Sequence, residues 1–418
     1  MLRVYGLKVN YWQPQLQSSE ASINTRCRNP TRLAMSIHFE SDTREARLLS
    51  PLKNFEPDIQ AIEHRRDPLT GRSVMVLRGR IDYVKRYLES DESAIDDLAN
   101  STQQGCPFCP DSVEKKSPKF ISEISAEGRI RVGEAVCFPS LFAHEDYNAV
   151  VVPTRSHKVP LNQMQPDMFV DAFKACIEYF RRVHAWKPAV KNNAIVMNFY
   201  PPAGSTITHP HLQTLASDLP LQATHELVEA SASYFQNAKS SYWAELVKAE
   251  ERVGARYLGR VGNVHWLTPF APMGLNEAQA IVPKVSDLNS LSNEDLNGLA
   301  EGVVKVLAYY HGIGIRSFNI AVYPGPFGEA LDYFDLGLRI VSRYGYKPRF
   351  VSDIWALQYL LGVQEVYEAP EETCSKLKKH FDYRSLATSG SDPLKSTAIA
   401  SRVSFGAEDR TRKQVSPP

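Results

Sequence analysis

The segment Ala203-Gly204-Ser205-Thr206-Ile207-Thr208-His209-Pro210-His211-Leu212-Gln213 follows the apolar run at 194–200. Alternate side chains of a strand share a face, so the spacing predicts that His209, His211 and Gln213 project together from one side of a sheet. The Gly-Ser-Thr loop before them can let a phosphate approach backbone N–H groups. These features indicate imidazole chemistry at phosphorus. The alternative is a pair of histidines that are merely hydrogen-bonded on a half-buried strand.

Length and composition exclude several classes of protein. A chain of 418 residues can bury one large core or two medium ones. A net charge of +1 produces no global field for a polyanion, so nucleic acid is not an expected partner and any phosphate contact must be local. The sequence contains no run of about 18 apolar residues, so no membrane span is predicted. Six cysteines in so long a chain do not make a disulfide framework, which favours a reducing, cytoplasmic location.

The two ends of the chain differ from the rest. Residues 1–34 carry five basic residues and only one acid, which is compatible with a targeting segment, with a mis-assigned start before Met35, or with simple disorder. We therefore predict a basic, disordered N-terminal extension over 1–42. The tail at 384–418 is rich in Ser, Thr and Lys without apolar periodicity, and is also predicted to be disordered.

The central part of the chain contains an internal repeat. Each copy has an apolar strand, a loop, a helix with apolar spacing of three and four, and a second strand. The copies are 149–153, 166–183 and 193–200, then 278–283, 293–310 and 317–323. Ser292 and Asp295 predict a capping box on the second helix. The charged segment 223–253 is interpreted as a solvated helical connector, which divides the chain into halves at 43–220 and 221–383.

Two further motifs lie in the first half. Arginines bracket the turn at 64–72, which leads into a strand, and could bind phosphate or simply be solvated. Cys106-Pro107-Phe108-Cys109 could be redox-active, metal-binding or incidental. Pro107 and Pro110 argue against a thioredoxin-like pair that opens a helix. A zinc tetrahedron would need two more ligands, for which the candidates are His157 and His209, with His144 as an alternate.

The motif at 209–213 resembles that of the galactose-1-phosphate uridylyltransferase branch of the histidine triad superfamily, and the similarity covers roughly residues 50–380. The turn Arg65–Gly71 and the pair Cys106 and Cys109 support it. The resemblance implies an α+β fold of two tandem histidine triad-like domains, each a mainly antiparallel sheet with packed helices. It also implies a homodimeric nucleotidyltransferase of carbohydrate, specifically galactose, metabolism. Such an enzyme passes a nucleoside monophosphate from a nucleotide sugar or dinucleotide to a phosphate or sugar phosphate.

The same resemblance implies roles for individual residues. His211 would be the nucleophile, and Gln213 would hold the phosphate of the covalent intermediate. The implied zinc ligands are Cys106, Cys109, His157 and His209. The implied substrate-binding residues are Arg65, Arg66, Arg72, Asn198, Gly204, Ser205 and Thr206.

The chain also departs from the uridylyltransferase pattern. Leu336-Gly337-Leu338 stands where those enzymes carry a second H-x-H run, so a second metal site is not expected. Leu212 stands between the second histidine and the glutamine of the motif. A leucine at this position is closer to the ADP-glucose phosphorylases and diadenosine tetraphosphate phosphorylases, which transfer adenylyl groups. The hydrolytic members of the superfamily have a third histidine at the position of Gln213, and that histidine could also shuttle protons. The glutamine therefore favours transfer over hydrolysis. A hydrolase of nucleotide conjugates and a non-catalytic, nucleotide-binding zinc protein are the alternative hypotheses.

Overall fold

The computed structural model describes residues 37–349 and 351–382. The predictions for the segment 1–34 and the tail 384–418 therefore lie outside the described residues. Within the described ranges, no helix is both long enough and apolar enough to cross a membrane. The predicted division of the chain near residue 220 stays a prediction.

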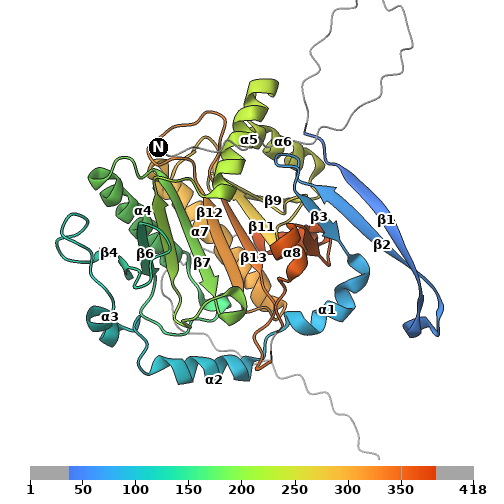
Figure 1. Ribbon diagram of the computed structural model, residues 1–418, viewed down its shortest axis with the longest axis horizontal. Coiled ribbons are helices and arrows are strands. Elements are labelled where there is room, and N and C mark those ends of the chain that lie inside the picture. Colours follow the sequence, from blue (N-terminus) through green and yellow to red (C-terminus); the bar gives the residue numbers. More distant parts are fainter. Residues whose placement is uncertain (1–36, 350, 383–418) are drawn as a thin grey trace, which may run out of the picture.

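A ten-stranded antiparallel sheet forms the centre of the molecule (Figure 1). Its two halves join where β7 pairs with β12, with Val196 opposite Ala321. The strand order is β4-β5-β6-β8-β7 in the first half and β12-β13-β11-β10-β9 in the second. The strands are β4 (Ile130–Val132), β5 (Ala135–Pro139), β6 (Tyr147–Val152), β8 (Leu212–Ser217), β7 (Asn192–Phe199), β12 (Phe318–Tyr323), β13 (Gly337–Ser342), β11 (Leu275–Ile281), β10 (Val264–Leu267) and β9 (Tyr257–Val261).

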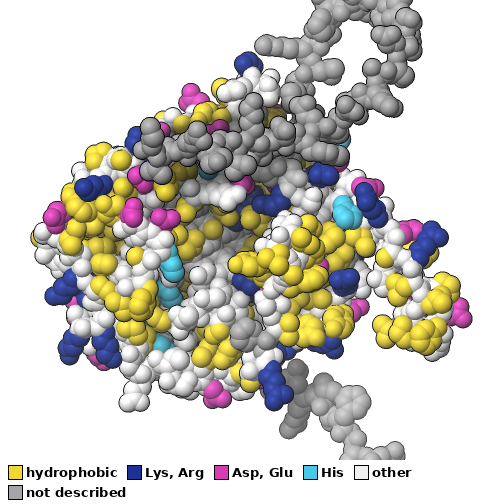
Figure 2. Space-filling view, in the orientation of Figure 1, with side chains coloured by type: hydrophobic (Ala, Val, Ile, Leu, Met, Phe, Trp, Pro, Cys, Tyr) yellow, Lys and Arg dark blue, Asp and Glu magenta, His cyan; other side chains and the backbone are white. Residues whose placement is uncertain are grey.

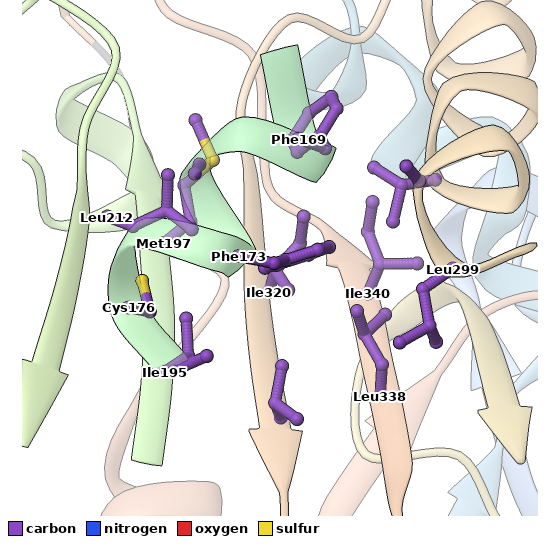
Figure 3. Packing of buried hydrophobic residues seen from close by; sticks show 14 of the residues in the cluster. Phe169, Phe173, Cys176, Ile195, Met197, Leu212, Leu299, Ile320, Leu338 and Ile340 are labelled. Atoms are coloured by element: carbon purple, nitrogen blue, oxygen red, sulfur yellow. The ribbon is translucent and has the colours of Figure 1, made fainter. Parts of the chain in front are cut away.

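Two long helices, α4 (Pro166–Trp186) and α7 (Asn293–Gly312), cover one face of this sheet. Alternate residues of each strand point into the layer between sheet and helices, as the period of a strand requires (Figure 3). The side chains labelled there include Phe173 and Cys176 of α4, Met197 of β7 and Leu299 of α7. The elements β6-α4-β7-β8 recur as β11-α7-β12-β13, which confirms the predicted repeat and the α+β class.

Close approach of α7 to the sheet depends on glycine. A Cβ added at Gly302 would overlap the ring of Trp266, which is fully buried, and one added at Gly298 would press on the Val261 carbonyl. The predicted capping box is present, because the Ser292 hydroxyl accepts from the Asp295 N–H while the Asp295 carboxylate accepts from the Ser292 N–H. The start of α7 is thus fixed by local hydrogen bonds and its position by small residues.

A second sheet flanks the first. It contains β1 (Ser41–Ser50), β2 (Glu56–Arg66), β3 (Ser73–Val76) and β14 (Gln364–Val366), in that order, and β14 runs parallel to β3. The β1–β2 hairpin projects from the body of the molecule (Figure 1). The helices α1 (Ile81–Leu88) and α8 (Ala356–Leu361) lie beside this sheet. The helix α9 (Pro370–Asp382) packs instead on α7 and β9, and it contributes Cys374 and Leu377 to the main core.

The prediction of a solvated helical connector at 223–253 was right about the helical structure and wrong about the solvation. The segment forms two helices, α5 (Gln222–Ala238) and α6 (Tyr242–Val253), separated at Lys239, which adopts a left-handed conformation. It is not simply solvated, because Trp243 and Leu246 of α6 are buried in a cluster with strand residues of the second half. The many charged residues hid an apolar stripe on one face of α6.

Candidate active site and metal centre

The two histidines of the motif lie just before β8, which begins at Leu212. The prediction that His209, His211 and Gln213 alternate along one strand was therefore wrong for the histidines. Leu212 opposite Met197 is the last pair between β8 and β7, and Pro210 has no N–H to extend the ladder. The segment bends instead, and gives the two imidazoles different surroundings.

The four predicted metal ligands converge. The sulfur and nitrogen donors of Cys106, Cys109, His157 and His209 all lie within 4.8 Å of one another. Cys109 Sγ is 3.5 Å from His157 Nδ1 and 3.6 Å from His209 Nδ1, and Cys106 Sγ is 3.9 Å from His209 Nδ1. Ligand atoms of a tetrahedral zinc site are separated by about 3.3–3.8 Å, given its usual bond lengths. The spacing therefore fits a metal ion, whereas His144 is exposed and outside the group.

The start of a helix positions one of the candidate ligands. The Cys109 residue caps the helix α3 (Pro110–Lys116), and Pro110 occupies its first position, where no N–H donor is needed. The prediction that the prolines oppose a helix here was wrong for that reason. The segment before α3 is the helix α2 (Glu92–Gln103) and not a strand, so the arrangement is still not that of a thioredoxin-like pair.

The outer nitrogens of both histidine ligands have partners. His209 Nε2 donates to the Thr154 carbonyl at 2.9 Å, which leaves Nδ1 unprotonated and facing the cysteines. His157 Nε2 lies 3.2 Å from the Thr102 hydroxyl, which itself donates to the Leu98 carbonyl. Burial lowers the pKa of His209 to about 4 and also lowers that of His157. Neutral imidazoles oriented in this way are what a metal ion requires.

His211 is held differently. Its Nδ1 donates to the backbone carbonyl of His209 at 2.9 Å, so Nε2 is the nitrogen with the free lone pair. Burial lowers the pKa of His211, so the ring is neutral at pH 7. The ring of Phe108, from the middle of the Cys-x-x-Cys segment, packs against it edge to face with 5.2 Å between centroids. A neutral, oriented imidazole is competent as a nucleophile.

The loop and strand residues predicted to bind substrate lie around this segment. Gly204 has φ +87°, and Ser205 donates its hydroxyl to the Ile207 carbonyl. Thr206 is exposed. Asn198 of β7 and Gln213 of β8 belong to the face of the sheet opposite the helices, as the pairing of Gln213 with Val196 shows. In the described part of the chain, the Gln213 amide forms no hydrogen bond, so it is available to a ligand.

The predicted arginines do not converge on His211 within the described chain. The guanidinium of Arg65 is 4% exposed and binds Glu63, both oxygens of Glu371 and the Phe270 carbonyl. Arg66 is exposed, at 3.8 Å from Glu40. Arg72 lies near Arg339 on β13, two strands beyond β7, and its Nε is buried without a hydrogen-bond partner.

Sequence reasoning missed several residues of the site. Thr102 and Thr154 hold the histidine ligands, Phe108 packs on His211, and Asn319 of β12 binds Asn198. Phe108 could have been suspected from its place between the two cysteines. The others carry no motif, because each reaches the site only through the pairing of distant segments.

Comparison with known proteins identifies similar folds. No family model matches the chain. An uncharacterized protein of Archaeoglobus fulgidus is 28% identical over 347 residues, covering 82% of this chain and 98% of its own length. An ADP-glucose phosphorylase from Arabidopsis thaliana, solved with bound ADP-glucose, aligns with a TM-score of 0.57 at 16% identity, over 76% of this chain and 99% of the other. A uridylyltransferase structure aligns with a TM-score of 0.55 at 19% identity, over 76% and 98%.

These likenesses define the class of fold. It is a two-half α+β fold with the repeated strand-helix-strand plan described above. More particularly, it is the fold of the ADP-glucose phosphorylase and of the uridylyltransferase.

Proposed function

We propose that the protein is a nucleotidyltransferase that moves a nucleoside monophosphate from a nucleotide sugar to a phosphate or sugar phosphate through a covalent bond to His211. The observation that carries this proposal is the hydrogen bond from His211 Nδ1 to the His209 carbonyl, which leaves Nε2 as the only nucleophilic atom of a neutral ring. The two similar structures are those of an ADP-glucose phosphorylase and a uridylyltransferase, and both names describe reactions of this kind.

In the first step, the Nε2 lone pair attacks the phosphorus next to the nucleoside, and a P–N bond forms. The bond from that phosphorus to the bridging oxygen breaks, and its electron pair leaves with the sugar phosphate. In the second step, an oxygen of the acceptor phosphate attacks, the P–N bond breaks, and its electron pair returns to Nε2. The Nδ1–H bond to the His209 carbonyl stabilises the positive charge that the ring carries between the steps. Gln213 supplies an amide donor to the phosphoryl oxygens.

Zinc is the ion that the two thiolates and two imidazoles suit best. The ion would be structural, because all four positions of the tetrahedron come from protein side chains. Burial beside a second cysteine raises the pKa of Cys109 to about 11, and the charge of a bound cation offsets that penalty. His209 would fix the backbone whose carbonyl orients His211, so a bound ion would help to hold the nucleophile in place without touching the substrate.

We also infer a homodimer. Large apolar side chains are exposed at the tip of the β1–β2 hairpin and on α8. Figure 2 shows apolar surface in both regions, on the same face of the molecule. They include Leu49, Leu52 and Phe55 on the hairpin and Tyr359, Leu360 and Leu361 on α8. A second copy would bury these surfaces. Sedimentation of the purified chain, with Leu52→Glu and Leu360→Glu as variants that should be monomeric, tests this.

The covalent intermediate provides the decisive experiment. The protein is mixed with ADP-glucose or UDP-glucose that carries radioactive phosphorus next to the nucleoside. We expect acid-labile label on the wild-type chain, its discharge by inorganic phosphate or a hexose phosphate, and no label on His211→Asn. His144→Asn, which changes an exposed histidine outside the cluster, is the matched control and should label normally.

Other outcomes separate the alternatives. A hydrolase would release nucleoside monophosphate in water at a rate that phosphate acceptors do not increase. A non-catalytic protein would bind the nucleotide sugar in calorimetry equally well as wild type and as His211→Asn, without turnover. Absence of label on a folded wild-type chain with both donors would contradict the proposal for these substrates.

A further inference from the structure

Asn319 of β12 links the half of the chain without the histidine motif to the proposed site. Asn319 faces Asn198 across the β7–β12 pair, on the sheet face opposite the helices. Its Nδ2 donates to Asn198 Oδ1 at 2.6 Å and to the Ala203 carbonyl at 2.9 Å. Both amide hydrogens of Asn319 are therefore used on the first half of the chain.

The orientation of the Asn319 amide is not arbitrary. Its Oδ1 accepts from Arg343 Nη1 at 2.8 Å, and arginine can only donate. The Ala203 carbonyl can only accept, so the nitrogen must face it. Each neighbour therefore specifies one end of the amide. If the Asn319 amide were flipped, its oxygen would face the Ala203 carbonyl oxygen and its NH2 group would face the Arg343 guanidinium.

Arg343 is itself fixed from the far side. Its Nε and Nη2 bind the Asp353 carboxylate at 2.6–2.9 Å, and both side chains are largely buried. The backbone carbonyl of Asp353 also accepts from Gln358 of α8. A continuous chain of hydrogen bonds thus runs from the segment before α8, through Arg343 and Asn319, to two points on the first half.

Those two points matter for the proposed chemistry. Ala203 ends the short 3-10 turn Pro201–Ala203 and precedes Gly204 and Ser205 of the proposed phosphate loop. Asn198 has its oxygen committed to Asn319, so its NH2 group points away from Asn319. That NH2 group forms no hydrogen bond within the described chain, and it is free to donate to a phosphate oxygen.

We propose that Asn319 is a positioning residue, which orients the Asn198 amide toward the phosphate that His211 attacks. This role rests on the function proposed above. It assigns to the second half an indirect role in the reaction, through Asn198, in addition to its share in the sheet.

The sharpest variant is Asn319→Asp, which keeps size and shape. A carboxylate there still binds Arg343, but it can only accept, so Asn198 must turn its NH2 group inward and present its oxygen to the phosphate. We expect label transfer to the enzyme from radioactive ADP-glucose or UDP-glucose, measured in a single turnover, to slow by roughly 10- to 100-fold, the value of one hydrogen bond to a charged group. Asn162→Asp makes the same chemical change on an exposed residue and should label like wild type.

A double-mutant cycle distinguishes positioning from general damage. If Asn319 acts through Asn198, then Asn319→Ala added to Asn198→Ala should slow labelling by much less than Asn319→Ala alone does. Bound metal and thermal midpoint, measured on every variant, report on folding. Wild-type labelling rates in a folded Asn319→Asp, or additive effects in the cycle, would overturn the proposal for Asn319 while leaving the covalent intermediate intact. Absence of label on wild type would overturn the proposed function and the role of Asn319 with it.

Discussion

Phe108 and His211 are in direct contact, with their rings edge to face and 5.2 Å between centroids. Phe108 lies between the two cysteines of the metal cluster, and the His211 ring is also bonded to the backbone of the ligand His209. The candidate metal ligands are therefore linked to the proposed nucleophile in two ways, by an aromatic contact and by the peptide of His209.

The first prediction concerns that aromatic contact. Phe108→Leu should cost about 1 kcal/mol of stability and slow His211 labelling by about 10-fold, because the ring that limits rotation of His211 is lost. Phe120→Leu is the control. Phe120 is equally buried, at 8% exposure, and stacks on Tyr179 in the main core, so it should lose similar stability with no change in labelling rate. Equal rates for the two variants would count against a role for Phe108.

The second prediction concerns the metal. Removal of the ion by a strong chelator should lower the thermal midpoint by at least about 5 °C, because a structural zinc contributes directly to folding. Cys106→Ser should contain less than one zinc per chain by atomic emission, whereas Cys176→Ala, at a buried cysteine outside the cluster, should keep it. A full complement of zinc in Cys106→Ser would show that the ion binds elsewhere.

The third prediction concerns the choice between transfer and hydrolysis. Gln213 is half-buried on β8 and can donate to a phosphate without taking up a proton. Gln213→His should increase the share of the covalent intermediate that is hydrolysed, because imidazole can act as a base toward water. The ratio of free nucleoside monophosphate to transfer product measures this. An unchanged ratio in an active variant would exclude this explanation for the glutamine.

The fourth prediction concerns acid stability. Burial alone would raise the pKa of Glu371, but hydrogen bonds from Arg65 and Arg256 lower it to about 2. Because the folded pKa lies below the ordinary value of 4.5, Glu371 contributes stability above about pH 4.5, and that contribution is lost as the pH falls toward 2. After allowance for its partial exposure, we expect about 2 kcal/mol.

Urea unfolding at several pH values checks this. Glu371→Gln should be less stable than wild type at pH 7 and should lose less stability between pH 5 and pH 3. Glu372→Gln, at a more exposed neighbour that pairs with Arg78, should follow the wild-type profile within about 0.5 kcal/mol. Parallel profiles for wild type and Glu371→Gln would contradict the assignment.

The fifth prediction concerns the packing of α7. Alanine is a better helix former than glycine, yet Gly302→Ala should destabilise the protein by about 2 kcal/mol, because its Cβ overlaps the buried Trp266 ring. Gly312→Ala, in the same helix with no atom within 4 Å of the new Cβ, should change stability little or raise it by about 0.5 kcal/mol. A stable Gly302→Ala would mean that α7 can shift away from the sheet without cost.

The sequence alone determined the features that depend on neighbouring residues. Apolar spacing predicted both long helices and the strands on either side of them, and Ser292 with Asp295 predicted the capping box. The pair Cys106 and Cys109, together with the candidates His157 and His209 that the family resemblance implied, predicted the four donors that converge. These signals are local because helix and strand periods and capping bonds span only a few residues.

Only the tertiary structure decided the remaining features. It showed that β8 begins after His211, that α6 buries an apolar face, and that Arg65 is bound to Glu371 instead of lying near His211. It also joined the two halves at β7 and β12, which sets Asn319 against Asn198 across 121 residues of chain. Such contacts depend on strand register and on the packing of distant segments, and neither leaves a periodic trace in the residues that form them.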